Sequence, residues 1–210
     1  MSIALQLQKI KRPGYQVELF VPDAQAVQAA YFQQKRVQVN VPFPHWTKLW
    51  PAGIALADYI HEHPEWVQGK RVLELAAGLG LPSMVAGRYA QEVCCSDYLP
   101  EAVEAIEQSA RHAQLSNFTA RLLDWNHLPH DLTAEVLLLA DINYDPEQFD
   151  RLYTVLLRFL AQGTTILLTT PQRLMAKPFI EKLLPLCTSQ KELVVVKDGQ
   201  ETMVSLLVME

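Results

Sequence analysis

The chain has 210 residues, 50% of them hydrophobic, and a net charge of -5, so it can bury a substantial core and fits one globular unit. No apolar run approaches the roughly 18 residues that suggest a membrane span, and the scattered basic residues argue against nucleic acid as a partner. The first residues lack a basic start followed by an apolar block, so we expect a cytoplasmic protein without a membrane partner.

The first 45 residues are predicted to form a small, strand-rich cap. Apolar residues alternate in 3–7 and in 15–21 with "KRPG" between them, which indicates a β-hairpin. Asp23 is suited to cap the short helix that follows it. The alternation resumes in 36–41 and predicts a further strand.

Residues 46–210 have the pattern of an α/β domain. A helix is expected from Pro51, because proline suits the first turn of a helix. Strand and helix patterns then alternate, which predicts a mostly parallel sheet with helices on both faces. The predicted strands are 71–75, 92–96, 118–123, 135–140 and 164–170, and the predicted helices are 82–90, 100–115, 146–160 and 173–186. Two strand patterns joined at Asp198 and Gly199 predict an antiparallel hairpin at the end of the chain.

The cysteines and histidines point to no special chemistry. Cys94, Cys95 and Cys187 are an odd number and two are adjacent, so we expect buried small hydrophobic residues rather than disulfides. The histidines lack the spacing and the companion cysteines of a zinc site, so we expect no metal.

The stretch "VLELAAGLGLPS", residues 72–83, ends a predicted strand in a glycine loop. Gly78 and Gly80 allow a sharp turn and the close approach of a ligand, although a bare G-x-G is more often an ordinary turn. Glu74 ends an apolar strand where an unpaired carboxylate is costly to bury, so it needs a polar or cationic partner. Asp97 ends the next strand about 20 residues later, where a carboxylate can accept hydrogen bonds from both ribose hydroxyls.

These features favour a ribose ligand that carries positive charge. A nicotinamide dinucleotide would also use the acid at Asp97. However, Ser83 stands at the last place of G-x-G-x-x-G, and Glu74 faces the position of a pyrophosphate. S-adenosylmethionine, which has a sulfonium and an ammonium group, fits better.

The motifs together resemble a known family. The segments "HWTKLWPAGIALADYI", "VLELAAGLGLPS", "CCSDYLPEAVEAI", "RLLDWNHL" and "LLLADINYDPE" are similar, in order and spacing, to the motifs of seven-strand S-adenosylmethionine-dependent methyltransferases, specifically methyltransferase family 16. The resemblance implies a Rossmann-like seven-strand sheet over residues 46–210, with an antiparallel last strand. It also implies S-adenosylmethionine as the cofactor, and a monomer that methylates a lysine side chain of a protein partner.

The resemblance assigns cofactor contacts to eight residues. Glu74 would hold the methionine ammonium and Asp97 the ribose, while the glycine loop would supply a backbone cradle. Ala76 stands where the family has glycine, so its Cβ is expected to tighten the pocket. The eight residues are Trp50, Glu74, Ala76, Gly78, Gly80, Asp97, Asp124 and Trp125.

Three of these residues have further roles implied by the resemblance. Asp124 would accept a hydrogen bond from the exocyclic amine of adenine, and Trp125 would supply an apolar wall beside it. Plain core packing is an equal alternative for Trp125. Trp50 would close over the cofactor, and its alternative is again a core aromatic residue.

Asp141 and Tyr144, in "DINY", are the predicted catalytic residues. They follow the apolar run 135–140 and so emerge at the carboxyl end of a central strand, and "DINY" resembles the D-x-x-Y pattern of the family's lysine-methylating members. An incoming amine must be neutral to attack, so positioning matters more than acid or base strength. Asp141 would orient the lysine nitrogen and Tyr144 would add a hydroxyl or ring face. The alternative is that Asp141 merely caps the next turn.

Two other functions stay open at this point. The acceptor is either a protein lysine or, alternatively, a small molecule or another nitrogen nucleophile. The chain lacks an N-P-P-Y-like motif, which argues against methylation of adenine or of a glutamine amide. A non-catalytic, cofactor-binding interaction module is the third possibility.

Overall fold

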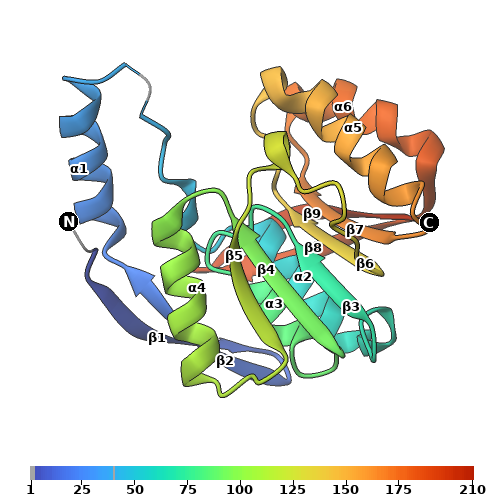
Figure 1. Cartoon of the computed structure of the whole chain (residues 1–210), viewed down its shortest axis with the longest axis horizontal. Helices are drawn as coiled ribbons and strands as arrows, with labels where there is room; N and C mark the ends of the chain where they lie inside the picture. Colours follow the sequence, from blue (N-terminus) through green and yellow to red (C-terminus); the bar gives the residue numbers. More distant parts are fainter. Residues whose placement is uncertain (1–2, 40) are drawn as a thin grey trace.

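The computed structural model describes residues 3–39 and 41–210, and it contains a seven-stranded sheet with helices on both faces (Figure 1). The strands lie in the order β5, β4, β3, β6, β7, β9, β8. Their bounds are β3 Arg71–Glu74, β4 Glu92–Asp97, β5 Phe118–Leu122, β6 Val136–Ala140, β7 Thr165–Pro171, β8 Cys187–Lys197 and β9 Gln200–Met209. The helices are α2 Pro51–Glu62, α3 Leu81–Ala86, α4 Pro100–His112, α5 Phe149–Leu160 and α6 Lys177–Leu183.

The pairing of the strands confirms the predicted fold class. Strands β3 to β7 pair in parallel, whereas β9 lies antiparallel between β7 and β8. The strand order reverses between β3 and β6, because β4 and β5 extend the sheet on one side and β7 extends it on the other. Such a switch point opens a crevice at the carboxyl ends of the parallel strands, which is where α/β proteins bind ligands.

Two hydrophobic cores lie on opposite faces of this sheet. Along the central strands, Val72 and Val136 belong to the core that contains α2, α3 and α4. Their neighbours Leu73 and Leu137 belong to the core under α5 and α6. All four side chains are buried, so the continuous apolar runs of the sequence reflect strands that are covered on both faces.

The N-terminal hairpin packs on the same body. Strands β1 (Leu5–Arg12) and β2 (Tyr15–Pro22) form a separate two-stranded antiparallel sheet. Tyr15, Val17 and Leu19 are buried in the core that contains α2, and the Asp58 carboxylate on α2 accepts hydrogen bonds from Arg12 and from the Tyr15 hydroxyl. Helix α1 (Ala24–Lys35) follows, and the Asp23 side chain caps it as expected.

The predicted strand at 36–41 is wrong. Residues 36–39 and 41 lie outside any strand, and Asn40 lies outside the described residues. Val37 and Val39 are 83% and 92% exposed, and the two-stranded sheet ends at Pro22. An alternating pattern becomes a strand only when it pairs with another strand, and the described residues of this segment pair with none.

All four helices predicted after β3 are shorter than expected. Helix α5 begins only at Phe149 and α6 spans only Lys177–Leu183, because the flanking residues form 3-10 turns at Pro146–Gln148, Leu174–Ala176 and Leu184–Leu186. Helix α3 ends at Ala86, where Gly87 takes the C-cap position. Helix α4 ends at His112, because Gln114 adopts a left-handed conformation with φ 57° that a helix cannot continue through.

The prediction for the cysteines is only partly confirmed. All three are free thiols, but Cys95 alone is fully buried, whereas Cys94 and Cys187 are half-buried.

Candidate functional site

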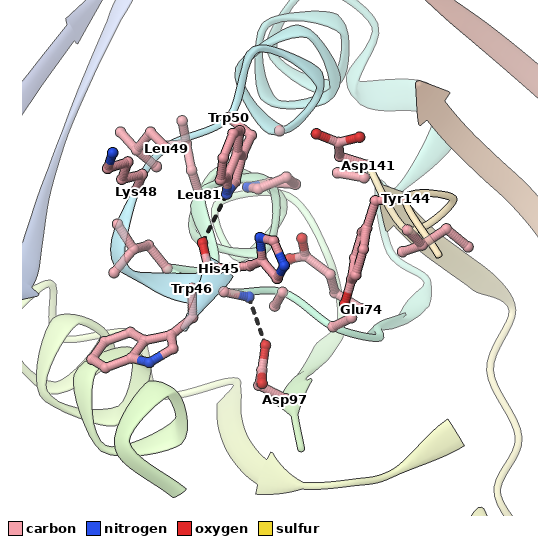
Figure 2. A pocket seen from close by; sticks show the side chains of 18 of the residues that line it. His45, Trp46, Lys48, Leu49, Trp50, Glu74, Leu81, Asp97, Asp141 and Tyr144 are labelled. Atoms are coloured by element: carbon pink, nitrogen blue, oxygen red, sulfur yellow. Dashed lines mark hydrogen bonds between the residues drawn. The ribbon is translucent and has the colours of Figure 1, made fainter. Parts of the chain in front are cut away.

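A pocket of about 210 Å³ opens at the carboxyl ends of β3, β4, β6 and β7 (Figure 2). Seven of the ten predicted site residues line it: Trp50, Glu74, Ala76, Gly78, Asp97, Asp141 and Tyr144. Asp124 and Trp125 line a neighbouring cavity, which shares Ala76, Tyr98 and Tyr144 with the first. Gly80 lines neither cavity. The sequence motifs therefore converge on one region of the fold.

The loop after β3 has a left-handed backbone at three positions. The φ angles of Ala76, Gly78 and Gly80 are 53°, 59° and 69°. Gly80 is the N-cap of α3, and a Cβ on it would lie 2.9 Å from the Cys95 sulfur. A glycine is therefore needed here for the turn and for the packing beneath the loop. Ala76 is strained, since a left-handed conformation costs an L-residue about 1–2 kcal/mol.

Glu74 ends β3 as a buried carboxylate, with 1% of its surface exposed. Its Oε2 accepts a hydrogen bond of 2.9 Å from the Ser83 backbone N–H at the start of α3. Burial raises the pKa of Glu74 to about 7, although the hydrogen bond from Ser83 opposes the shift. Among the described residues, no lysine, arginine or histidine lies within salt-bridge distance of it.

Asp97 ends β4 and is also buried, with 4% of its surface exposed. Its Oδ2 accepts from the Gly78 N–H at 2.9 Å and its Oδ1 from the Leu99 N–H at 3.1 Å; the first of these is drawn in Figure 2. Burial raises its pKa. Each carboxylate oxygen can accept a further hydrogen bond, so Asp97 can hold the glycine loop and still bind a ligand hydroxyl.

Asp141 follows β6 and is 7% exposed. Its backbone is left-handed, with φ 58°, and its N–H donates to the Thr169 carbonyl of β7 at 2.9 Å. Both of its carboxylate oxygens are held by the Arg173 guanidinium, with Nη1 on Oδ1 and Nη2 on Oδ2, the latter at 2.8 Å. The predicted catalytic carboxylate is thus already paired with a cation of the chain itself.

Tyr144 and Trp50 both contact His45. The Tyr144 ring lies 4.7 Å from the His45 ring, centroid to centroid, and burial raises the pKa of the Tyr144 phenol, so it stays protonated. The Trp50 indole N–H donates to the His45 carbonyl at 2.8 Å. Trp50 is 37% exposed, so it lies at the pocket wall and does not belong to the core, which was the alternative for this residue.

The neighbouring cavity is built around a short helical turn, η3 (Trp125–His127). Asp124 caps this turn by accepting from the Asn126 N–H at 2.9 Å, and its other oxygen lies 3.0 Å from His127 Nδ1. The Trp125 indole N–H donates to Gln148 at 3.4 Å, and the ring packs against the core under α5. Trp125 therefore lines this cavity and also packs against the core.

The pocket residues that the sequence analysis missed include His45, Tyr98 and Arg173. Tyr98 directly follows Asp97, and Arg173 follows the carboxyl end of β7. The rule that polar residues after parallel strands meet at one edge of the sheet would have identified both. His45 lies far from any strand of the sheet in sequence, and only its place in "FPHWTKLW" beside Trp50 marks it.

The described residues contain neither a cluster of metal-ligating side chains nor a membrane-spanning helix. No group of three or more His, Cys, Asp or Glu side chains is arranged to hold a metal ion within 3–39 and 41–210. In the same ranges, no helix is both long and apolar enough to cross a membrane.

The known sequences that are similar to this chain include two proteins named as methyltransferases. The human histone-arginine methyltransferase METTL23 is 33% identical over 108 residues, which cover 49% of this chain and 57% of that protein. The rat electron transfer flavoprotein beta subunit lysine methyltransferase is 33% identical over 135 residues, covering 62% and 51%. The chain thus aligns with about half the length of these curated relatives.

Solved structures share the fold. The T. thermophilus 16S rRNA N2 G1207 methyltransferase RsmC, in complex with AdoMet and guanosine, has a TM-score of 0.63 at 16% identity over 100% of this chain and 51% of that one. The Synechocystis magnesium protoporphyrin IX methyltransferase, with bound SAM, has a TM-score of 0.56 at 12% identity over 90% and 98%. A family model described as lysine methyltransferase matches residues 45–185, and the chain therefore belongs to that family.

Proposed function

We propose that this chain is an S-adenosylmethionine-dependent methyltransferase that transfers a methyl group to a lysine side chain of a protein. The observation that carries the proposal is the pair of buried carboxylates, Glu74 and Asp97, which line one pocket without a cationic partner among the described residues. A buried, unpaired carboxylate is costly unless a ligand compensates it. The family match and the relatives support the same reaction.

The residues of the pocket fit this cofactor. Glu74 would pair with the ammonium of the methionine moiety, because its pKa of about 7 lets it ionise when a cation approaches. Asp97 would accept hydrogen bonds from the ribose hydroxyls. The adenine would enter the neighbouring cavity lined by Asp124 and Trp125. When bound, the cofactor supplies an electrophilic methyl group on a sulfonium.

The chemistry asks little of the protein beyond positioning. With the cofactor bound, a neutral acceptor amine would use its lone pair to take the methyl group, and the carbon–sulfur electron pair would remain on sulfur. The methylated nitrogen is then cationic and loses its proton to solvent. Asp141 and Tyr144 line the pocket, and their carboxylate and phenol would hold the amine in line with the methyl group.

The relatives differ in the acceptor that their names state, which is arginine for METTL23 and lysine for the flavoprotein methyltransferase. The pairing of Asp141 with Arg173 supports lysine, because both carboxylate oxygens already hold one guanidinium. We further propose the cytoplasm as the compartment, supported by three cysteines that form no disulfide. We also propose a monomer, as the resemblance to methyltransferase family 16 implies.

The test uses methyl-labelled S-adenosylmethionine, the purified protein and an extract of the source organism. Mass spectrometry should find label on lysines of one or a few proteins with the wild type and not with Asp141→Ala, while calorimetry shows that the variant still binds the cofactor. Label in small molecules alone would move the acceptor to that class. Cofactor binding without label in any fraction would contradict the enzymatic proposal and favour a binding module.

A further inference from the structure

We propose that Arg173 neutralises Asp141 and thereby sets the acceptor end of the pocket to take a primary amine in its uncharged, nucleophilic form. The inference rests on the proposed function, whose acceptor class it deepens. Arg173 is a positioning residue here, because it acts on the acceptor through Asp141.

The pair is held by the sheet and not by flexible loops alone. Asp141 follows β6 and Arg173 follows β7, and these two strands are neighbours in parallel register. Asp141 N–H bonds to Thr169 of β7, and Arg173 N–H bonds to the Pro171 carbonyl at 2.8 Å. The backbones on both sides are therefore fixed at the same edge, and the bidentate fork fixes the plane of the carboxylate.

An uncompensated carboxylate would hinder the reaction. Asp141 is 7% exposed, and a carboxylate in such a site stabilises the protonated form of a nearby amine and raises its pKa. A lysine has an ordinary pKa of about 10.4, so further stabilisation of its ammonium would remove the lone pair that must attack. The guanidinium of Arg173 removes this bias because it brings the net charge of the pair to zero.

The pair keeps the ability to orient a neutral amine. Each carboxylate oxygen of Asp141 can accept more than the one hydrogen bond that Arg173 donates, so an amine N–H can still bind and direct its lone pair elsewhere. An arginine suits this task, since it stays protonated in proteins and cannot exchange a proton with the acceptor. A second guanidinium could not bind Asp141 in the same bidentate manner without displacing Arg173.

Among the described residues, Arg173 is the only cation within salt-bridge distance of Asp141. His45 lies at the same end, and burial is the main cause that lowers its pKa; Asp141 raises this pKa and Arg173 lowers it, so the pair acts on His45 in opposite directions. Glu74 and Asp97 lie at the cofactor end. The full set of titratable and charged side chains that line the pocket is His45, Lys48, Glu74, Asp97, Tyr98, Asp141, Tyr144 and Arg173.

The test measures binding without turnover. The protein is saturated with S-adenosylhomocysteine, and calorimetry at pH 7.5 compares three probes of the acceptor site: n-butylammonium, n-butylguanidinium and the neutral 1-butanol. The variants are Arg173→Gln, which is neutral but still offers an N–H to Asp141, and Arg173→Lys, which keeps the charge. Lys177→Met is the matched control, because Lys177 is exposed and pairs only with Glu181 on α6 among the described residues.

The wild type and Lys177→Met should bind n-butylammonium no more tightly than 1-butanol. Arg173→Gln should bind n-butylammonium about tenfold more tightly than the wild type does, which corresponds to one pKa unit of lost compensation, and Arg173→Lys should restore the wild-type preference. Equal probe preferences in the wild type and Arg173→Gln would overturn the inference. Tightest binding of n-butylguanidinium to the wild type would also overturn it and point to an arginine acceptor.

These outcomes are separable from the proposed reaction. If no lysine is labelled in the extract, the probe preferences still report on the Asp141 and Arg173 pair. If lysine is labelled, the rate of Arg173→Gln should recover at alkaline pH, where more of the acceptor amine is neutral. A purely structural role for Arg173 would lower the rate by the same factor at every pH, and that result would contradict the inference.

Discussion

The replacement Glu74→Gln should separate the effect of this buried carboxylate on folding stability from its effect on cofactor binding. In the fold, burial raises the pKa of Glu74 from 4.5 to about 7, so the folded state favours the protonated form. The resulting loss of folding stability is absent below the unfolded pKa and grows as the pH rises above 4.5. It is complete above pH 7, where it amounts to about 3 kcal/mol. Glutamine keeps an oxygen that can accept from Ser83 N–H but cannot ionise. Glu74→Gln should therefore stabilise the ligand-free protein at pH 8 and change it little at pH 5.

Cofactor binding should respond in the opposite direction. A cationic methionine moiety needs Glu74 ionised, so the affinity of the wild type should rise about tenfold between pH 6 and pH 8, as expected for one group with a pKa of about 7. Glu74→Gln should lose this pH dependence and bind roughly 10–100-fold more weakly at pH 8, the range expected for a charge-assisted hydrogen bond.

Two assays measure these effects. Urea unfolding at pH 5 and pH 8 gives the free energy of unfolding of both proteins without ligand, and calorimetry from pH 6 to pH 8 gives the affinity for S-adenosylmethionine. The same slope of affinity against pH in Glu74→Gln and in the wild type would refute the assignment of the ammonium to Glu74. Destabilisation of the ligand-free variant at pH 8 would refute the argument from burial.

Three further predictions concern the loop, the ribose and the hairpin. Asp97→Ala should weaken cofactor binding by more than about tenfold, since it removes both the ribose acceptor and the bond that holds Gly78; unchanged affinity in calorimetry would remove the ribose assignment. Ala76→Gly should change the free energy of unfolding by less than about 1 kcal/mol, because relief of the left-handed strain is offset by glycine entropy. Ala76→Val should lower the free energy of unfolding by more than about 2 kcal/mol, because a β-branched residue is an outlier in this conformation. Equal stabilities of these two variants in urea titrations would contradict this prediction. Asp58→Ala should leave Arg12 and the Tyr15 hydroxyl without their partner and cost about 2–3 kcal/mol. Limited proteolysis should then cut the hairpin first, and an unchanged cleavage pattern would mean that the apolar face of β2 suffices to hold it.

The sheet could be predicted because its strands are covered on both faces. Runs such as 136–140 are apolar at every position. Such a run indicates a buried strand whichever elements cover its two faces. The segment 36–41 has an equally clear alternation, but its described residues pair with no strand, so the local pattern alone does not decide the structure there. Gln114 has a left-handed backbone and follows the end of α4. No property of a glutamine side chain predicts this conformation.

The site was predictable where the chemistry depends on a strand end. Glu74 and Asp97 end parallel strands and Asp141 directly follows one, and the topology brings these positions to one edge of the sheet. The partners of these carboxylates were not predictable, because they come from later or distant segments. Arg173 meets Asp141 only because β7 lies beside β6, and His45 reaches Tyr144 from a segment that precedes the first helix of the domain.

The identity of the methylated amino acid tests the central claim most directly. Proteins labelled by the wild type in the presence of methyl-labelled S-adenosylmethionine are hydrolysed completely, and the labelled amino acids are separated against standards of methyllysine and methylarginine. The proposed function predicts label in methyllysine, and its loss with Asp141→Ala. Label in methylarginine, or equal labelling of lysine by the wild type and the variant, would contradict it.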